Sequence, residues 1–131
     1  MKKELDEALC RDFPNVFKNR HGDMRSTAMC WGFDCGAGWE PLIREAAAKL
    51  EALIIKHKEQ HPEDEYIGIA SQIKEKYGTL CFYISCGTDE MWAVVEEAEK
   101  KSETVCEQCG EPGSLRGRSW YYTACDAHTK G

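Results

Sequence analysis

Two pairs of potential metal ligands near the C-terminus carry the clearest chemistry in this 131-residue sequence. The first pair reads C-E-Q-C and the second reads C-D-A-H, so the four candidate ligands are Cys106, Cys109, Cys125 and His128. This spacing lets both side chains of each pair reach one ion, and three thiolates with one imidazole suit tetrahedral Zn²⁺. Because four protein ligands fill the coordination sphere, the pattern predicts one structural zinc ion. The alternative is a chance spacing of buried thiols.

Four other cysteines form two further pairs, Cys30 with Cys35 and Cys81 with Cys86. A second zinc site would need these pairs to converge, but positions five apart on a continuous strand point to opposite faces. We therefore expect these cysteines to pack as small hydrophobic side chains. Redox chemistry is one alternative, and a nucleophilic Cys30 or Cys35 activated by His21 is another.

The sequence contains none of the motifs typical of the common catalytic classes. A glycine-rich phosphate loop, a G-x-S-x-G elbow and an H-E-x-x-H helix are all missing, and the acidic residues form no recognisable catalytic pair. His57 falls on an apolar helix stripe, so we expect it to be partly buried and satisfied, whereas His61 lies in a charged loop and should be solvated. We therefore assign no catalytic residue.

Two segments combine aromatic and charged side chains, which are favoured at protein interfaces and also stack on bases. One is the glycine-rich loop that ends at Trp39, and the other lies between the two ligand pairs. The second segment could instead be structural, with every second residue of its strand packed against the zinc knuckle and the last helix. The candidate binding surface consists of Trp31, Asp34, Trp39, Arg116, Arg118, Trp120 and Tyr122.

The charge balance bears on the kind of partner. The formal net charge is −6, and most of the acidic excess falls between residues 40 and 102. Duplex-binding proteins usually carry a basic stripe, so this balance disfavours nucleic acid as a partner, although the arginines near Trp120 could make a local contact. An acidic surface fits a protein partner, or simply solubility.

The elements that must position these residues follow from periodicity. A short helix is expected over residues 3–11, followed by an irregular segment held by Phe13, Phe17, Trp31 and Phe33. The clearest helix runs from about Pro41 to His57 or a little beyond, with apolar residues at i, i+3, i+4 and i+7 on one face.

Alternating apolar residues predict two strands after this helix. Ile67, Ile69 and Ile73 mark the first strand, residues 74–78 supply a turn, and residues 79–85 form the second strand of an antiparallel hairpin. Thr88 can cap a second helix that ends near Ser102. The expected class is α+β: amphipathic helix, antiparallel β-hairpin and second helix, then a zinc-ribbon or treble-clef-like module. Residues 1–102 would form the core, and residues 103–131 the zinc-binding module packed on it.

The same features predict a compartment. No stretch reaches the ~20 apolar residues of a membrane span, so we expect no membrane association. The charged start leads into no apolar signal region, so the eight cysteines are better interpreted as reduced thiols and metal ligands than as a disulfide framework. We expect a cytoplasmic protein.

From about residue 13 to the end, the sequence resembles a widespread family of small bacteriophage and prophage proteins with a C-terminal CxxC…CxxH zinc module. The likeness rests on three stretches: GFDCGAGW followed by Leu42-Ile43; SQIKEKYGTL continuing to Phe82-Tyr83; and CEQCGEPG with Trp120 and TACDAH. Cys81 stands where such proteins often have a basic residue, which weakens a second metal site further. The resemblance implies a phage origin and action in the host cytoplasm, and it carries no catalytic residue with it.

Three function classes remain open at this point. The leading hypothesis is a non-enzymatic zinc protein that binds a host protein and modulates or inhibits it, with defence and regulatory proteins as the candidate targets. The second is a nucleic-acid-associated zinc protein. The third is a small hydrolase or nuclease that uses the Cys30–Trp39 loop, with Asp34 or Cys35 in its chemistry.

Overall fold

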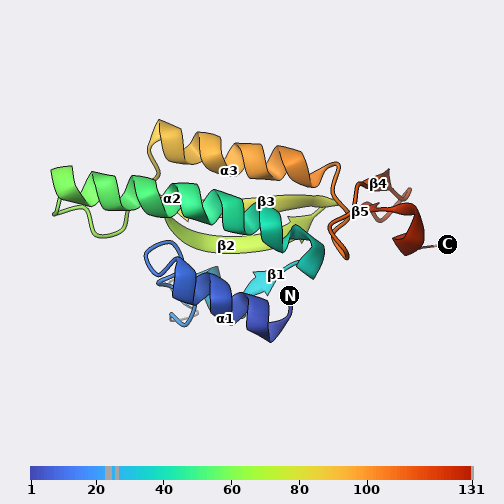
Figure 1. Cartoon of the computed structure of the whole chain (residues 1–131), viewed down its shortest axis with the longest axis horizontal. Coiled ribbons are helices and arrows are strands. Elements are labelled where there is room, and N and C mark those ends of the chain that lie inside the picture. The colour runs from blue at the N-terminus through green and yellow to red at the C-terminus, as the bar shows by residue number, and fades with distance from the viewer. Residues whose placement is uncertain (23–24, 26, 131) are drawn as a thin grey trace.

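The computed structural model describes residues 1–22, 25 and 27–130, and it has the expected α+β class (Figure 1). Within these residues the helices are α1 (Lys3–Asp12), α2 (Glu40–Gln60) and α3 (Asp89–Ser102). The strands are β1 (Phe33–Asp34), β2 (Ile69–Lys76), β3 (Thr79–Ser85), β4 (Ser114–Arg116) and β5 (Tyr122–Ala124). Short 3-10 turns are η1 (Ala28–Trp31), η2 (Ala37–Trp39) and η3 (Asp126–His128).

The main sheet has the order β1-β2-β3 and is covered by helices. β2 pairs antiparallel with β3 as predicted, whereas β1 pairs parallel with β2 through Phe33 opposite Ile73. In Figure 1, α2 and α3 lie side by side against the hairpin, and α1 lies near β1. The sequence did not reveal β1, because two residues are too few to show an alternating pattern.

The hydrophobic core lies between the sheet and the helices. One face of α2 is buried, as its periodicity predicts, and the helix ends at Gln60, a little beyond His57 as expected. Phe17 and Phe33 are core residues, as predicted, and Phe13 packs against the core. Trp31 is not a core anchor: its side chain is 71% exposed. The largest fully buried side chains include Trp39, Phe82, Leu9, Met29, Ile43, Leu50, Ile73 and Met91.

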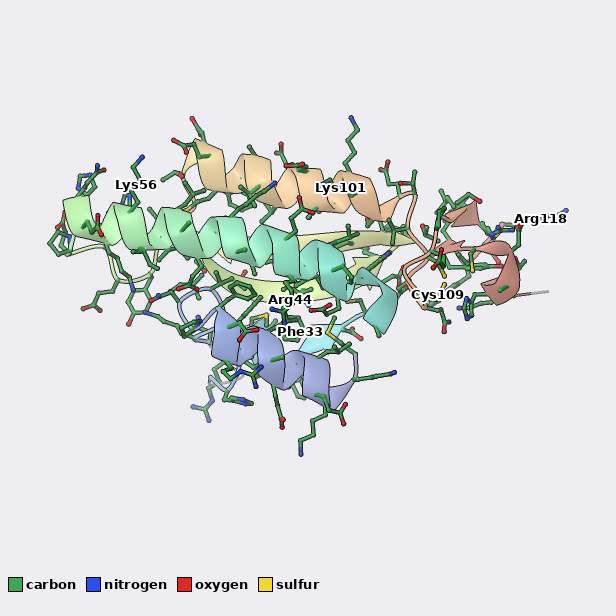
Figure 2. The ribbon with its side chains drawn as sticks, in the orientation of Figure 1. Phe33, Arg44, Lys56, Lys101, Cys109 and Arg118 are labelled. Carbon is green, nitrogen blue, oxygen red and sulfur yellow. The ribbon has the colours of Figure 1, made fainter. Side chains whose placement is uncertain are left out.

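Charged side chains on α2 hold the N-terminal segment. The Glu51 carboxylate accepts hydrogen bonds from the backbone N–H groups of Asn15 and Val16, at 3.1 Å each. Arg44 donates to Asp12 at the end of α1 and to Glu40, and Figure 2 places its side chain between α2 and α1. The loop after α1 is therefore ordered by side-chain hydrogen bonds rather than by regular structure of its own.

The hairpin turn is shorter than the sequence analysis predicted. The first strand continues through Lys76 into the expected turn, so only Tyr77 and Gly78 lie between β2 and β3, at φ values of 54° and 86°. Two successive left-handed residues are the requirement of a two-residue type I′ turn, whose twist matches that of the flanking strands. Glu75 accepts a hydrogen bond from the Gly78 N–H at 2.7 Å, which stabilises this turn.

Side chains of α3 cover the outer edge of β3. The Leu80 N–H donates to Ser102 Oγ, and the Phe82 N–H donates to Glu99 Oε2, each at 2.9 Å. An edge strand with unpaired N–H groups is a template for pairing with another chain. These two bonds remove that hazard along the buried half of the strand, and they fix α3 in register with the hairpin. No helix among the described residues has the length and apolar character of a membrane span.

Candidate metal centre and adjoining surface

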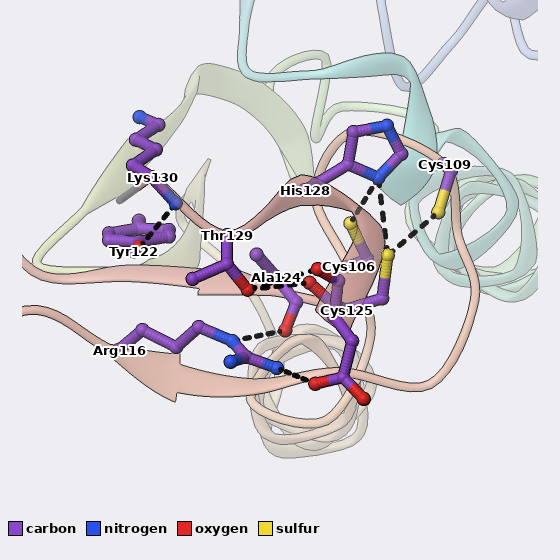
Figure 3. A network of polar contacts seen from close by, with 10 residues as sticks. Cys106, Cys109, Arg116, Tyr122, Ala124, Cys125, His128, Thr129 and Lys130 are labelled. Carbon is purple, nitrogen blue, oxygen red and sulfur yellow. Dashed lines mark hydrogen bonds and ion pairs between the residues drawn. The ribbon is translucent and has the colours of Figure 1, made fainter.

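The four predicted metal ligands converge on one point. Cys109 Sγ lies 3.6 Å from Cys125 Sγ, and His128 Nδ1 lies 3.2 Å from Cys125 Sγ and 3.7 Å from Cys106 Sγ (Figure 3). All four donor atoms lie within 4.8 Å of one another. Sulfurs bonded to one tetrahedral ion at ~2.3 Å would be about 3.8 Å apart. The cluster could therefore hold a metal ion without large rearrangement.

Two turns present these ligands. Cys106 and Cys109 lie on a knuckle that begins after α3, in which the Gly110 N–H donates to the Cys106 carbonyl at 2.9 Å and Gly110 has a φ of 82°. The second pair follows β5, where η3 folds back so that the His128 N–H donates to the Cys125 carbonyl at 3.1 Å. The antiparallel ribbon β4–β5 lies between the pairs, which is the ribbon-like module that the sequence predicted.

The knuckle also prepares Cys106 to act as a thiolate. Burial alone would raise the pKa of this thiol, but backbone N–H groups of Cys125, Cys109 and Gln108 point at the sulfur and lower its pKa to about 6. A thiolate is the form of cysteine that binds a metal ion. At Cys106 the backbone of the two turns therefore favours the charge state that metal binding requires.

The C-terminal module, residues 103–130, is tied to the core by the loop around η2. The Gly38 N–H donates to the Glu107 carbonyl at 2.7 Å, and the Gly36 N–H donates to the Glu107 carboxylate at 2.8 Å. A Cβ atom on Gly38 would lie 2.6 Å from Glu107 O and 2.6 Å from Gly110 N, so glycine is required there. Burial raises the pKa of Glu107, and the Gly36 N–H opposes this. These hydrogen bonds run to the η2 loop, which directly precedes α2.

Trp39 is not part of a binding surface, contrary to the sequence prediction. Its side chain is fully buried in the core, and its Nε1–H donates to the Val105 carbonyl at 2.8 Å. The prediction failed because a tryptophan in a glycine-rich loop has the same local sequence whether it points inward or outward. Its actual function is to join the core to the chain segment that leads into Cys106.

The ribbon β4–β5 does carry an exposed surface. Trp120 is 74% exposed, and the neighbouring Leu115 and Tyr121 are 53% and 43% exposed. Trp120, Arg118, Arg116 and Tyr122 line one groove of about 740 Å³. Of the seven predicted surface residues, these four are therefore brought together at one end of the molecule, where Figure 2 shows Arg118.

Within that surface, the two arginines differ. Arg116 donates to the Ala124 carbonyl at 2.9 Å and to Asp126 at 2.8 Å, so it stabilises the ribbon and the turn that carries His128. Throughout the described part of the chain, no ion pair involves Arg118. Arg118 is therefore the cation that a partner can engage.

The Cys30–Trp39 loop is divided between surface and interior. Trp31 is exposed and Asp34 is exposed at the edge of the sheet, but Cys35 is buried. Burial, and then the charge of Glu107, raises the pKa of Cys35 to about 12, so this thiol is a poor nucleophile. Cys30 is half-buried and donates to the Thr27 carbonyl at 3.3 Å.

The expected packing of the remaining cysteines is only partly correct. Cys81 is half-buried on β3, but Cys86 is exposed directly after the strand, where its φ is 50°. A residue in the left-handed region ends the strand and turns its side chain away from the sheet. Cys86 is therefore a surface thiol rather than a small hydrophobic core residue.

His57 in α2 and His61 directly after it agree with the sequence analysis. His57 is partly buried, and its Nε2 lies 2.7 Å from Asp64 Oδ2, so it is satisfied by a neighbour. His61 is exposed, as predicted, in a group with Glu63 and Asp64. Exposed acidic groups commonly gather in this way without an ion, so we assign no metal to them.

Sequence reasoning missed Tyr77, which is 74% exposed beside the ribbon. With Trp120 and Tyr121 it lines a second groove of about 380 Å³. A Tyr-Gly dipeptide between two alternating runs was the signal available for this turn.

Comparison of the chain with models of known protein families, with curated proteins and with solved structures found no match.

Proposed function

We propose that this chain is a non-enzymatic zinc protein that binds another protein through the exposed surface of its β4–β5 ribbon. The observation that carries the proposal is Trp120, a large aromatic side chain that is 74% exposed next to Arg118 on a ribbon held by a ligand cluster. Tryptophan and arginine are the residue types most enriched among the side chains that dominate protein-interface energies.

Zinc is the ion we propose for the cluster. Thiolate and imidazole donors in a tetrahedral arrangement suit Zn²⁺, whereas carboxylate and carbonyl oxygens would be expected for Mg²⁺ or Ca²⁺. Four protein ligands leave no open coordination position, so the ion's role is to stabilise the module that presents Trp120. The purified protein should contain one zinc per chain by elemental analysis, and a metal-free protein with an ordered C-terminal module would contradict the proposal.

The partner we propose is a host protein in the cytoplasm of an infected bacterium. The support is the resemblance of this chain to small phage and prophage proteins. Modulation or inhibition of a defence or regulatory protein would follow from stoichiometric binding.

Affinity capture from host lysate tests this function. The tagged, zinc-loaded protein would be incubated with lysate with and without nuclease, and bound proteins would be identified by mass spectrometry. We expect one stoichiometric host protein that resists nuclease and is lost on Trp120→Ala. Trp31→Ala is the matched control, because Trp31 is 71% exposed but lies in the η1 loop. If capture is lost only on Trp31→Ala, the binding surface is the η1 loop and not the ribbon.

A nucleic-acid-associated zinc protein is the second candidate. One observation favours it: exposed aromatic rings lie among arginine and lysine side chains in the two grooves, as they do on surfaces that stack single-stranded bases. The overall charge of −6 opposes it. Captured partners that disappear after nuclease treatment would favour this candidate over the first.

The hydrolase or nuclease hypothesis finds less support. Its candidate loop offers Asp34 on the surface, but the neighbouring Cys35 is buried with a raised pKa. Activity lost on Asp34→Asn in a protein that keeps its fold would revive it.

A further inference from the structure

The exposed ribbon is only part of a larger surface, because the β2–β3 turn docks against it. Thr123 Oγ1 donates to the Gly78 carbonyl at 2.6 Å, and a Cβ atom on Gly78 would lie 2.5 Å from Leu115 Cδ1 and 3.1 Å from Tyr122 N. The glycine therefore allows the turn and the ribbon to meet closely, and Tyr77, its neighbour, projects beside the ribbon. One surface is thus built by two segments far apart in sequence.

We define this composite surface by the residues that line its two grooves. Trp120 and Ser119 belong to both grooves, so there is space for side chains on each side of the indole. The basic members are Lys74, Lys76, Arg116, Arg118 and Lys130, and the aromatic members are Tyr77, Trp120, Tyr121 and Tyr122.

The charge of the composite surface is opposite to that of the whole chain. Five basic side chains line it, and its one carboxylate, Glu75, is engaged by the Gly78 N–H. Arg116 is engaged by Asp126, but across the described residues no ion pair involves Lys74, Lys76 or Arg118. Because the chain as a whole has a charge of −6, the surface outside this patch is more acidic still.

We infer that the composite surface binds an acidic segment of a polypeptide, in which carboxylates pair with Lys74, Lys76 and Arg118 while an apolar or aromatic side chain packs beside Trp120. This inference rests on the proposed protein-binding function and names the chemistry of the partner. Charge complementarity of this kind sets specificity and association rate, and the aromatic contact supplies the desolvated area.

The size of the patch favours a peptide over a nucleic acid. A nucleic-acid strand carries one phosphate charge at every nucleotide along its whole length. Phosphates beyond the patch would therefore lie against the acidic remainder of the protein, whereas the acidic run of a peptide can end where the patch ends. Peptide binding should also depend on metal binding. Arg118 and Trp120 lie between the two ligand pairs and are presented only when the module is folded.

The test uses two pools of short synthetic peptides and the zinc-loaded full chain. Every peptide in the first pool contains several Asp or Glu residues and one aromatic residue; the second pool has Asn and Gln in place of the acids. We expect the acidic pool alone to shift the NMR signals of Tyr77 and of the Trp120 indole. Arg118→Glu and Lys74→Glu should each weaken the binding about tenfold or more, and Lys56→Glu, an exposed lysine on α2, should not.

Three outcomes would overturn the inference: equal shifts from both pools, no shifts from the acidic pool, or tighter binding of an oligothymidylate that depends on the same residues. The affinity capture distinguishes these from failure of the proposed function. A host protein captured through Trp120 but insensitive to Arg118→Glu and Lys74→Glu would leave protein binding intact and refute the acidic partner. Capture of nothing, or only of nuclease-sensitive partners, would count against the function itself.

Discussion

At the scale of single residues, the metal cluster depends on donor atoms that two turns bring to one point. Backbone N–H groups around Cys106 lower its pKa to about 6, against the effect of burial. The same chain contains thiols in the opposite environment, such as Cys35. One residue type therefore serves as a ligand in one place and as inert packing in another, and the difference lies in the surrounding hydrogen-bond donors.

Cys109→Ser should remove one ligand and weaken metal binding greatly, because a serine hydroxyl is a poor zinc ligand. We expect the protein to lose its zinc and residues 104–131 to exchange backbone hydrogens faster, while α2 and the hairpin stay largely protected. Elemental analysis and hydrogen exchange measure this. Cys86→Ser, a change of the exposed cysteine outside the cluster, is the control and should keep the metal.

The alkylation rates of the cysteines outside the metal cluster should be lower for buried thiols than for exposed ones. Burial, followed by the charge of Asp6, raises the pKa of Cys10 to about 11, and the pKa of Cys35 is about 12. Below these values the thiolate fraction falls tenfold per pH unit, so at about pH 8 both should react with iodoacetamide far more slowly than the exposed Cys86. Mass spectrometry of the zinc-loaded protein gives the order. Equal rates for Cys35 and Cys86 would contradict the packing described above.

At the scale of elements, close backbone approaches join the C-terminal module to the core. Gly36 and Gly38 lie against the knuckle, and Gly78 lies against the ribbon. Trp39 adds a hydrogen bond to Val105 from inside the core. These contacts come from two separate segments of the core, the η2 loop and the hairpin turn, so the orientation of the module is set by backbone shape more than by any single side chain.

Gly38→Ala should destabilise the protein by about 1–3 kcal/mol, because a methyl group there meets backbone atoms of Glu107 and Gly110 that cannot move aside. Zinc affinity should fall as well, since the knuckle would shift. Gly87→Ala is the control: the nearest atom to its Cβ is Ile84 Cδ1, the end of a side chain that can rotate. Urea denaturation of both variants measures the difference, and equal losses would contradict the proposed docking.

Glu99 should make stability depend on pH through α3. Burial raises its pKa in the folded state, and the Phe82 N–H only partly opposes this. The folded protein therefore holds this proton more tightly than the unfolded chain. The stability contributed is fully present below the unfolded pKa and is lost as pH rises through the folded pKa.

Glu99→Gln keeps an acceptor for the Phe82 N–H and removes the titration. The free energy of unfolding of the variant minus that of the wild type should therefore increase between about pH 4 and pH 7. Denaturation of both proteins at a series of pH values checks this. A difference that stays constant would show that Glu99 does not titrate differently in the folded state.

At the scale of the whole molecule, metal, core and surface form one connected system. The ligand cluster stabilises the ribbon, the ribbon contacts the hairpin turn, and the η2 loop contacts the knuckle. Loss of the metal ion should therefore destabilise the core as well as the C-terminal module.

Chelation should lower the melting temperature of the wild type. A ligand present at about 100 times its Kd stabilises the folded state by about 2.7 kcal/mol, so its removal costs that amount. Cys109→Ser should melt at the chelated temperature and show no further decrease in chelator. Scanning calorimetry with and without chelator measures both, and a wild type whose melting temperature is unaffected would contradict a stabilising ion.

Local sequence was sufficient for much of the fold and for the ligands. Helical periodicity identified α2 and α3, alternation identified the hairpin, and the CxxC…CxxH spacing identified the four side chains that converge and could hold a metal ion, because each of these patterns is set by short-range geometry. Boundaries differed by a few residues, and the short parallel strand β1 left no pattern.

Tertiary structure alone decided which side chains face outward. Trp39 and Trp31 lie in the same loop, yet one is buried and the other exposed, since packing partners distant in sequence determine each environment. The composite surface was equally hidden, because Tyr77 and Trp120 become neighbours only when Gly78 docks on the ribbon. The sequence by itself determined the elements and the metal ligands through local spacing, and long-range packing determined the surface that a partner would meet.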